Sequence, residues 1–311
     1  MAKPVARKRL FGVLAVALAS LHASIQANEE SSSSFKNVVK SFDSAGVTVF
    51  QIPNFLPKEV AEKWRNRLRE EWLIQQETCP TNHTQWTYAT NANGSNSKER
   101  SLENVSKRRE MALELKEFNK FAYAKWELEH GDLFHEMEEY FLRPETIEQV
   151  EGILLDQGIE VSLLPQLSDF FVTQYSSGDF LSKHNDYYAG SWAFVISLMD
   201  SPEEDAVWQD HFGGQLRFEC PFSSTAKRQS TTGSSNDNPE DSFWCSSVPP
   251  AFNTALIFQT GRYRNLTRGP YHEVLRVAEA AEAAGFRRFG LTGWYVDKED
   301  RHSQSLLNKK T

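Results

Sequence analysis

Three side chains of this sequence have the types and the spacing that a bound metal ion requires. His184 and Asp186 lie two residues apart at the end of a run that reads as a β-strand. Side chains two apart in a strand point to the same face, so an imidazole and a carboxylate are presented together. His272 lies in a second strand-like run, PYHEVLRV. Two histidines and one carboxylate, with coordination positions left open, form the ligand set typical of non-haem Fe(II).

A second His-x-Asp pair, His130 and Asp132, shows that the spacing alone is not sufficient. This pair lies in a helix-patterned segment, AKWELEHGDLFHEMEEYFL. Residues two apart in a helix are about 200° apart around its axis and cannot hold one ion. The pair at 184 and 186 passes this test because its context is extended.

Short motifs surround the candidate ligands in a particular order. Before the pair come Tyr175 and GDFL (178–181); after it come FGGQL (212–216), LIF (256–258), HEV (272–274) and RFGLTGW (288–294). This order resembles the 2-oxoglutarate- and Fe(II)-dependent dioxygenases of the prolyl 4-hydroxylase catalytic-domain type. Within them it is most similar to the branch of the ribosomal-protein prolyl hydroxylases, and the resemblance covers residues 45–298.

The resemblance implies a set of catalytic roles. The implied Fe(II) ligands are His184, Asp186 and His272, and the implied contacts to the distal carboxylate of 2-oxoglutarate are Arg288, Tyr175 and Thr292. The cofactors and co-substrates would be Fe(II), 2-oxoglutarate and O₂, with ascorbate to restore oxidised iron. The implied reaction hydroxylates a peptidyl residue, with proline favoured, and forms succinate and CO₂.

Arg288 has a neighbour, Arg287, that is its rival as the co-substrate anchor. A dicarboxylate that chelates iron at one end needs a cation at its far end, and arginine offers a planar bidentate fork. Strand alternation places Arg288 on the same face as Thr292 and Trp294, which favours it over Arg287. Gly290 stands where relatives often have a hydroxyl residue, which departs from the family pattern.

Two other classes of function remain open at this stage. Zinc accepts the same three ligands with an open fourth position, so the chain is alternatively a zinc-dependent hydrolase on a jelly-roll fold. A non-catalytic jelly-roll binding protein with a residual metal site is the third interpretation. The zinc interpretation gives no purpose to Arg288 or Tyr175.

The elements that must position these residues change in kind near residue 162. Helical patterns occupy 58–76, 108–141 and 144–158 of the first half, with a strand at 47–56 and a polar loop at 78–107. Seven short strand patterns follow, at 168–176, 179–185, 191–199, 213–220, 253–260, 270–277 and 287–297. An Ala/Glu-rich run between the last two predicts a short helical turn. We therefore predict a mainly β fold with flanking helices (α+β): a double-stranded β-helix (jelly roll) buttressed by N-terminal helices.

The predicted organisation is one catalytic domain between two short terminal segments. We expect a signal peptide (1–27), a disordered lead-in (28–44), a single domain (45–298) and a tail (299–311). Within the domain we expect helical support at 57–160, the jelly-roll core at 162–298 and a polar insertion at 221–244.

The first 27 residues predict entry into the secretory pathway. Basic residues precede an apolar run that ends in small residues, which is the pattern of a signal peptide. An uncleaved anchor with a lumenal catalytic domain is the alternative. Four sequons (Asn82, Asn93, Asn104 and Asn265) fit passage through that pathway. In its oxidising compartment we expect a disulfide between Cys220 and Cys245, with two reduced thiols as the alternative. The net charge of −8 argues against nucleic acid as a partner, and the sequence does not specify the oligomeric state.

Overall fold

The computed structural model describes residues 39–44, 47–77, 86–90, 97–99, 121–126, 132–186, 189–203, 206–219, 244–260 and 270–307. The predicted signal peptide, the four sequons, Cys220 and nearly all of the polar insertion lie outside these ranges. Within them, no helix has the length and apolar character needed to cross a membrane.

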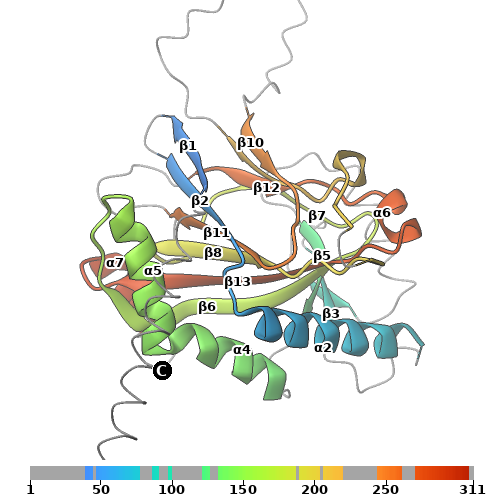
Figure 1. Cartoon of the computed structure of the whole chain (residues 1–311), viewed down its shortest axis with the longest axis horizontal. Helices are drawn as coiled ribbons and strands as arrows, with labels where there is room; N and C mark the ends of the chain where they lie inside the picture. Colours follow the sequence, from blue (N-terminus) through green and yellow to red (C-terminus); the bar gives the residue numbers. More distant parts are fainter. Residues whose placement is uncertain are drawn as a thin grey trace, which may run out of the picture. The chain divides into compact units, whose positions relative to one another are not determined.

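The described strands form one sheet in which neighbouring strands run antiparallel. Its first part is, in spatial order, β1 (Val39–Ser44), β2 (Val47–Pro53), β11 (Thr254–Gln259), β8 (Trp192–Ser197), β13 (Arg288–Asp297) and β6 (Leu163–Tyr175) (Figure 1). The order continues with β5 (Phe121–Trp126), β7 (Phe180–His184), β12 (His272–Val274), β9 (Leu216–Glu219) and β10 (Trp244–Val248). Two further strands, β3 (Trp86–Thr90) and β4 (Ser97–Glu99), pair with each other, and β3 also pairs with β5.

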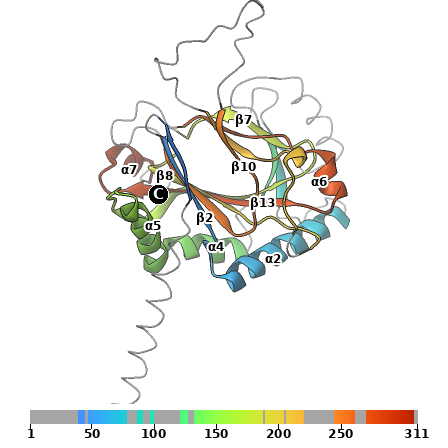
Figure 2. The same ribbon diagram turned by 45° about the horizontal axis from the view of Figure 1, so that its top comes forward.

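Helices cover the outer face of the first part of the sheet. They are α2 (Lys58–Glu77), α4 (Asp132–Leu142) and α5 (Pro144–Asp156), which begins at a proline as predicted. Shorter elements are η3 (Asp210–Phe212), α6 (Glu279–Ala283) and α7 (Arg301–Leu307). In Figure 2 the strands of this first part lie between α2 and α4 at the bottom and β7 and β10 toward the top.

The hydrophobic core between helices and sheet is aromatic. Phe141 of α4 packs with its ring 4.7 Å from that of Phe194 on β8 and 5.6 Å from that of Phe170 on β6. Trp64 of α2 is fully buried and its ring lies 6.1 Å from that of Phe141. Because side chains alternate along each strand, burying these rings turns the neighbouring residues to the opposite face of the sheet.

The structure agrees with the predicted strands and corrects part of the first half. All seven predicted strand segments contain a strand, and the Ala/Glu-rich run forms α6. The predicted helix at 108–141 is wrong over 121–126, which is β5, and is correct for α4. The predicted loop at 78–107 contains β3 and β4, and the predicted disordered lead-in contains β1. Strand pairing overrides local preference in these segments: β1 pairs with β2, β4 with β3, and β5 with β3, β6 and β7. The mostly antiparallel sheet with helices agrees with the predicted class, and the jelly roll stays a prediction.

Asn253 fastens the start of β11 to the segment between β2 and α2. Its backbone φ is 53°, a left-handed conformation that asparagine tolerates better than most residues. Its buried side chain accepts a hydrogen bond from Leu56 N (2.9 Å) and donates one to Leu56 O (2.7 Å). We expect Asn253→Ala to lower the free energy of unfolding by about 3 kcal/mol, through two lost hydrogen bonds and backbone strain.

Asn54 provides a matched control for this prediction. Its φ is 54°, and its side chain is exposed. Asn54→Ala should therefore cost only the backbone strain, about 1 kcal/mol. Urea denaturation of both variants measures the difference, and equal losses would show that the two side-chain hydrogen bonds contribute nothing.

Candidate functional site

The three candidate metal ligands meet in the structure. His184 ends β7 and His272 begins β12, and the two residues are directly paired across these strands. Asp186 follows β7, and its two carboxylate oxygens lie 3.5 Å from His184 Nε2 and 3.5 Å from His272 Nε2. The potential ligand atoms all lie within 4.8 Å of one another. Cis ligands about 2.1 Å from one ion lie roughly 3 Å apart, so a small closing movement suffices to hold a metal.

The backbone fixes the tautomer of both histidines. Nδ1 of His184 lies 2.9 Å from Ser182 O, and Nδ1 of His272 lies 3.0 Å from Pro270 O. A carbonyl can only accept, so each Nδ1 carries a hydrogen, and in a neutral imidazole with this tautomer Nε2 has the lone pair that a metal requires. Burial, together with the neighbouring His272, lowers the pKa of His184 to about 4. His184 is therefore neutral at physiological pH, which is the state that binds a metal.

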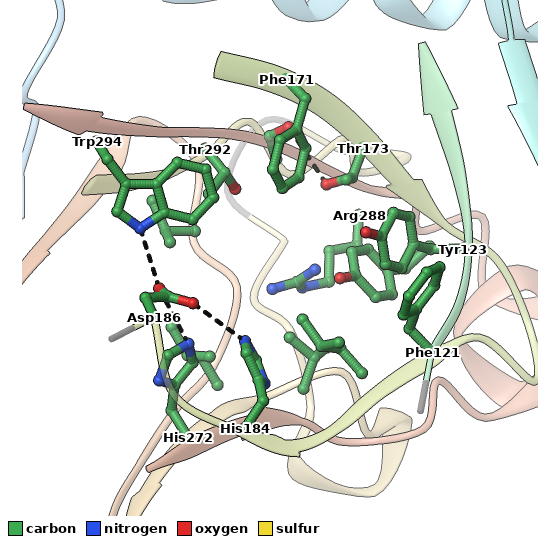
Figure 3. Close-up of a pocket in the computed structure, with 16 residues that line it drawn as sticks. Phe121, Tyr123, Phe171, Thr173, His184, Asp186, His272, Arg288, Thr292 and Trp294 are labelled. Atoms are coloured by element: carbon green, nitrogen blue, oxygen red, sulfur yellow. Dashed lines mark hydrogen bonds and ion pairs between the residues drawn. The ribbon is translucent and has the colours of Figure 1, made fainter. Parts of the chain in front are cut away.

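Trp294 orients the carboxylate of the site. Its indole Nε1 donates a hydrogen bond to Asp186 Oδ2 over 3.2 Å, as Figure 3 shows. Trp294 and Arg288 line the same pocket, as strand alternation predicts.

Removing the indole N–H should weaken metal binding without unfolding the protein. Partners that hydrogen-bond a metal ligand typically contribute 10- to 100-fold to affinity, so we expect Trp294→Phe to weaken Fe(II) binding about 10-fold. An anaerobic Fe(II) titration measures the change. Trp208→Phe is the control, because this indole donates to Gly213 O instead and should leave Fe(II) affinity unchanged.

Arg288 supplies the only guanidinium among the described residues that line this pocket. The Arg288 side chain points into the pocket that also contains the three candidate ligands, and Arg288 is only 6% exposed (Figure 3). Within the described part of the chain no carboxylate pairs with it, and its Nε has no hydrogen-bond partner. Burial lowers the pKa of Arg288, and Tyr175 partly offsets this effect. A buried cation without a counter-ion indicates a place for an anionic ligand.

Arg287, the rival anchor, lies away from the pocket. Its Nη1 is 3.3 Å from Asp200 Oδ2, and the backbones of Arg287 and Asp200 also pair. Arg69 of α2 reaches the other oxygen of the same carboxylate over 3.1 Å. Through Asp200, Arg287 thus links the start of β13 to the segment after β8 and to α2. Its side chain lies away from the pocket, as strand alternation predicts.

The remaining predicted site residues line the same pocket. Tyr175 is paired with Arg288 across β6 and β13, and the Arg288 Cζ lies 4.4 Å from the Tyr175 ring centroid. Burial raises the pKa of Tyr175 to about 12, which keeps its hydroxyl protonated and able to donate. Thr292 also lines the pocket, on the Arg288 face of β13.

Several pocket residues were not predicted from the sequence. Thr173 lies opposite Gly290 on the neighbouring strand and its hydroxyl donates to Gly290 O over 3.3 Å. Thr173 therefore supplies a hydroxyl at the position where Gly290 has none. Because Thr173 and Tyr175 are two apart on β6, strand alternation predicts that both face the pocket. The wall of the pocket, whose volume is about 210 Å³, also includes Phe121, Tyr123 and Phe171. The first two come from β5, for which the sequence carries no strand signal strong enough to predict them.

Comparison with known proteins identifies the core of this chain. Residues 170–296 match the family model of the 2OG-Fe(II) oxygenase superfamily, where 2OG is 2-oxoglutarate. This segment contains all six predicted site residues, and the match confirms the predicted resemblance to the superfamily. No curated protein matches the chain.

Solved structures similar to the chain include three enzymes with low sequence identity. A prolyl-4-hydroxylase from Pseudomonas putida is 16% identical, with a TM-score of 0.40, over 81% of this chain and 93% of that chain. A viral collagen prolyl hydroxylase from Paramecium Bursaria Chlorella virus-1 is 11% identical, with a TM-score of 0.37, over 80% and 96%. A non-haem α-ketoglutarate-dependent epimerase from nogalamycin biosynthesis is 13% identical, with a TM-score of 0.36, over 80% and 78%. The similarity to the superfamily rests on the matched segment rather than on these likenesses.

Proposed function

We propose that the chain is an Fe(II)- and 2-oxoglutarate-dependent dioxygenase that hydroxylates a peptidyl residue, with proline as the favoured target. The observation that carries this proposal is the pairing of two features in one pocket. Three potential metal ligands converge there, and a buried arginine without a described counter-ion faces the same space.

The residues present fit the iron that the superfamily implies. His184, Asp186 and His272 would hold it through two Nε2 atoms and a carboxylate oxygen. Imidazoles oriented by backbone carbonyls and a hydrogen-bonded carboxylate are donors that suit Fe(II), and they leave coordination positions open. The bound metal would supply the redox chemistry by which O₂ oxidises 2-oxoglutarate to succinate and CO₂ and the substrate C–H bond to C–OH.

The chain's own contribution is to bind and orient the co-substrate and to exclude water. Arg288 would pair with the distal carboxylate of 2-oxoglutarate through its two terminal nitrogens, and Tyr175 and Thr292 would add hydroxyl donors. Because Arg288 is buried, this ion pair is stronger than it would be at the surface. The pairing of Tyr175 with Arg288 across β6 and β13 holds the Tyr175 ring against the guanidinium.

The pocket wall supports a compact apolar substrate side chain. Its aromatic residues include Phe171 and Trp294, whose ring centroids lie 5.6 Å apart, and Tyr123. A pyrrolidine ring presents apolar C–H groups that pack well against such rings. A proline-containing peptide therefore remains the favoured substrate.

Succinate formation by the purified full chain tests the proposal. The assay contains Fe(II), ascorbate, 2-oxoglutarate and O₂, with a panel of proline-containing peptides beside the same peptides with alanine at each proline. We expect succinate, and a gain of one oxygen atom by a peptide that depends on the proline. Turnover of 2-oxoglutarate with oxidation of another residue would keep the dioxygenase class and reject proline.

Metal identity separates the zinc hydrolase from the dioxygenase. If Zn²⁺ supports activity that Fe(II) does not, and the metal-loaded chain does not bind 2-oxoglutarate, the dioxygenase proposal is wrong. Binding of 2-oxoglutarate without any turnover would favour the non-catalytic binding protein.

The secretory location stays a prediction, because it rests on the first 27 residues and on sequons outside the described ranges. Expression of the full chain in a eukaryotic cell, followed by glycosidase treatment, tests it. A shift to lower apparent mass indicates lumenal passage. Alkaline extraction of the membranes then distinguishes a cleaved chain, which is released, from an anchored one, which stays in the membrane.

A further inference from the structure

Three aromatic rings and a guanidinium form a continuous stack along one side of the pocket. The Phe121 and Tyr123 rings lie 5.2 Å apart at 32°, and the Tyr123 and Tyr175 rings lie 5.3 Å apart at 35°. The Arg288 Cζ lies 4.4 Å from the centroid of the Tyr175 ring, which completes the stack. Figure 3 shows Phe121, Tyr123 and Arg288 on the side of the pocket opposite to Asp186.

The outer half of this stack comes from β5, which lies outside the segment that matches the superfamily model. β5 pairs with β6 through Ala124 and Gln174, and with β7 through Phe121 and Leu181. It thus runs alongside both the strand that bears Tyr175 and the strand that ends in His184. Phe121 and Tyr123 are two apart, so both rings face the pocket.

We infer that Tyr123 is a positioning residue for the co-substrate: its ring holds Tyr175 against Arg288 and keeps water from the guanidinium. This inference rests on the proposed function, because it assumes that Arg288 binds a carboxylate of 2-oxoglutarate. An ion pair in a water-excluded environment is stronger and less sensitive to salt than an exposed one. The ring, rather than the hydroxyl, performs this role, because the contact between Tyr123 and Tyr175 is a ring contact.

The test measures 2-oxoglutarate binding to the metal-loaded full chain by titration calorimetry at low and high salt. We expect Tyr123→Leu to weaken 2-oxoglutarate binding about 10-fold, which matches the upper end of the free energy that one aromatic pair contributes. Binding by this variant should also depend more strongly on salt. Tyr123→Phe keeps the ring and should bind within about two-fold of the native chain. Phe121→Leu, one ring further from Arg288, should have a smaller effect than Tyr123→Leu.

Each outcome separates this inference from the proposed function. If the native chain binds 2-oxoglutarate and Arg288→Ala does not, but Tyr123→Leu binds normally, only the role of Tyr123 is wrong. Equal weakening by Tyr123→Phe and Tyr123→Leu would assign the effect to the hydroxyl and overturn the role of the ring. Weakening without a change in salt dependence would overturn the water-exclusion role. If the native chain does not bind 2-oxoglutarate, the proposed function itself fails.

Thermal denaturation of each variant verifies that it is folded.

Discussion

His184→Ala is expected to abolish Fe(II)-dependent turnover while the protein remains folded. The substitution removes one of three protein ligands, and the remaining Asp186 and His272 cannot define the same coordination face. Loss of a residue that only orients a ligand costs 10- to 100-fold in metal affinity, so loss of the ligand itself should cost at least about 100-fold. Anaerobic Fe(II) titration and succinate formation measure the two effects separately.

His135→Ala is the matched control for this variant. His135 is an exposed histidine on α4 and does not line the pocket. Its replacement should leave Fe(II) affinity and turnover unchanged. Full activity of His184→Ala would remove this residue from the metal site and would require another ligand set.

Arg288→Met is expected to lose 2-oxoglutarate binding without losing stability in the absence of ligand. Truncating one partner of a buried charge pair costs roughly 2–5 kcal/mol, which corresponds to at least about a 30-fold loss of affinity. In the ligand-free chain, however, the guanidinium is buried without a described carboxylate partner, and methionine relieves that penalty. Binding should therefore fall while the unfolding temperature of the ligand-free protein stays constant or rises.

Arg287→Met should produce the reverse result. This residue pairs with the buried carboxylate of Asp200, so its loss leaves part of a buried charge unpaired and lowers stability. It does not line the pocket, so 2-oxoglutarate affinity should be retained. If instead Arg287→Met loses binding and Arg288→Met retains it, the two roles are exchanged.

Sequence reasoning reached the residues whose placement depends on strand alternation. The i and i+2 rule selected Arg288 over Arg287, because this choice concerns one strand. It also placed His184 beside Asp186, although Asp186 lies two residues beyond the end of β7. The meeting of His184 with His272 required the pairing of β7 with β12, which only the resemblance to a known family implied.

The segment 121–126 shows why the rest was not predictable. Its sequence, FAYAKW, is short and lies between runs that have helical patterns, so local preference indicates a helix. The strand exists because β3 pairs with it along one side, and β6 and β7 pair with it one after the other along the other side. Such pairing is a property of the assembled sheet, so Phe121 and Tyr123 could not be assigned to the pocket from their neighbours in sequence.

The two cross-strand pairs at the site imply that binding of the metal and binding of the co-substrate are coupled. His184 with His272 belongs to the β7–β12 part of the sheet, and Tyr175 with Arg288 belongs to the β6–β13 part. Under the proposed function, a dicarboxylate held by the metal at one end and by Arg288 at the other links these two parts. Metal and co-substrate binding are then reciprocally coupled, each increasing the affinity for the other by the same factor. The resistance of the fold to heat should accordingly rise more when both are present than the sum of their separate effects.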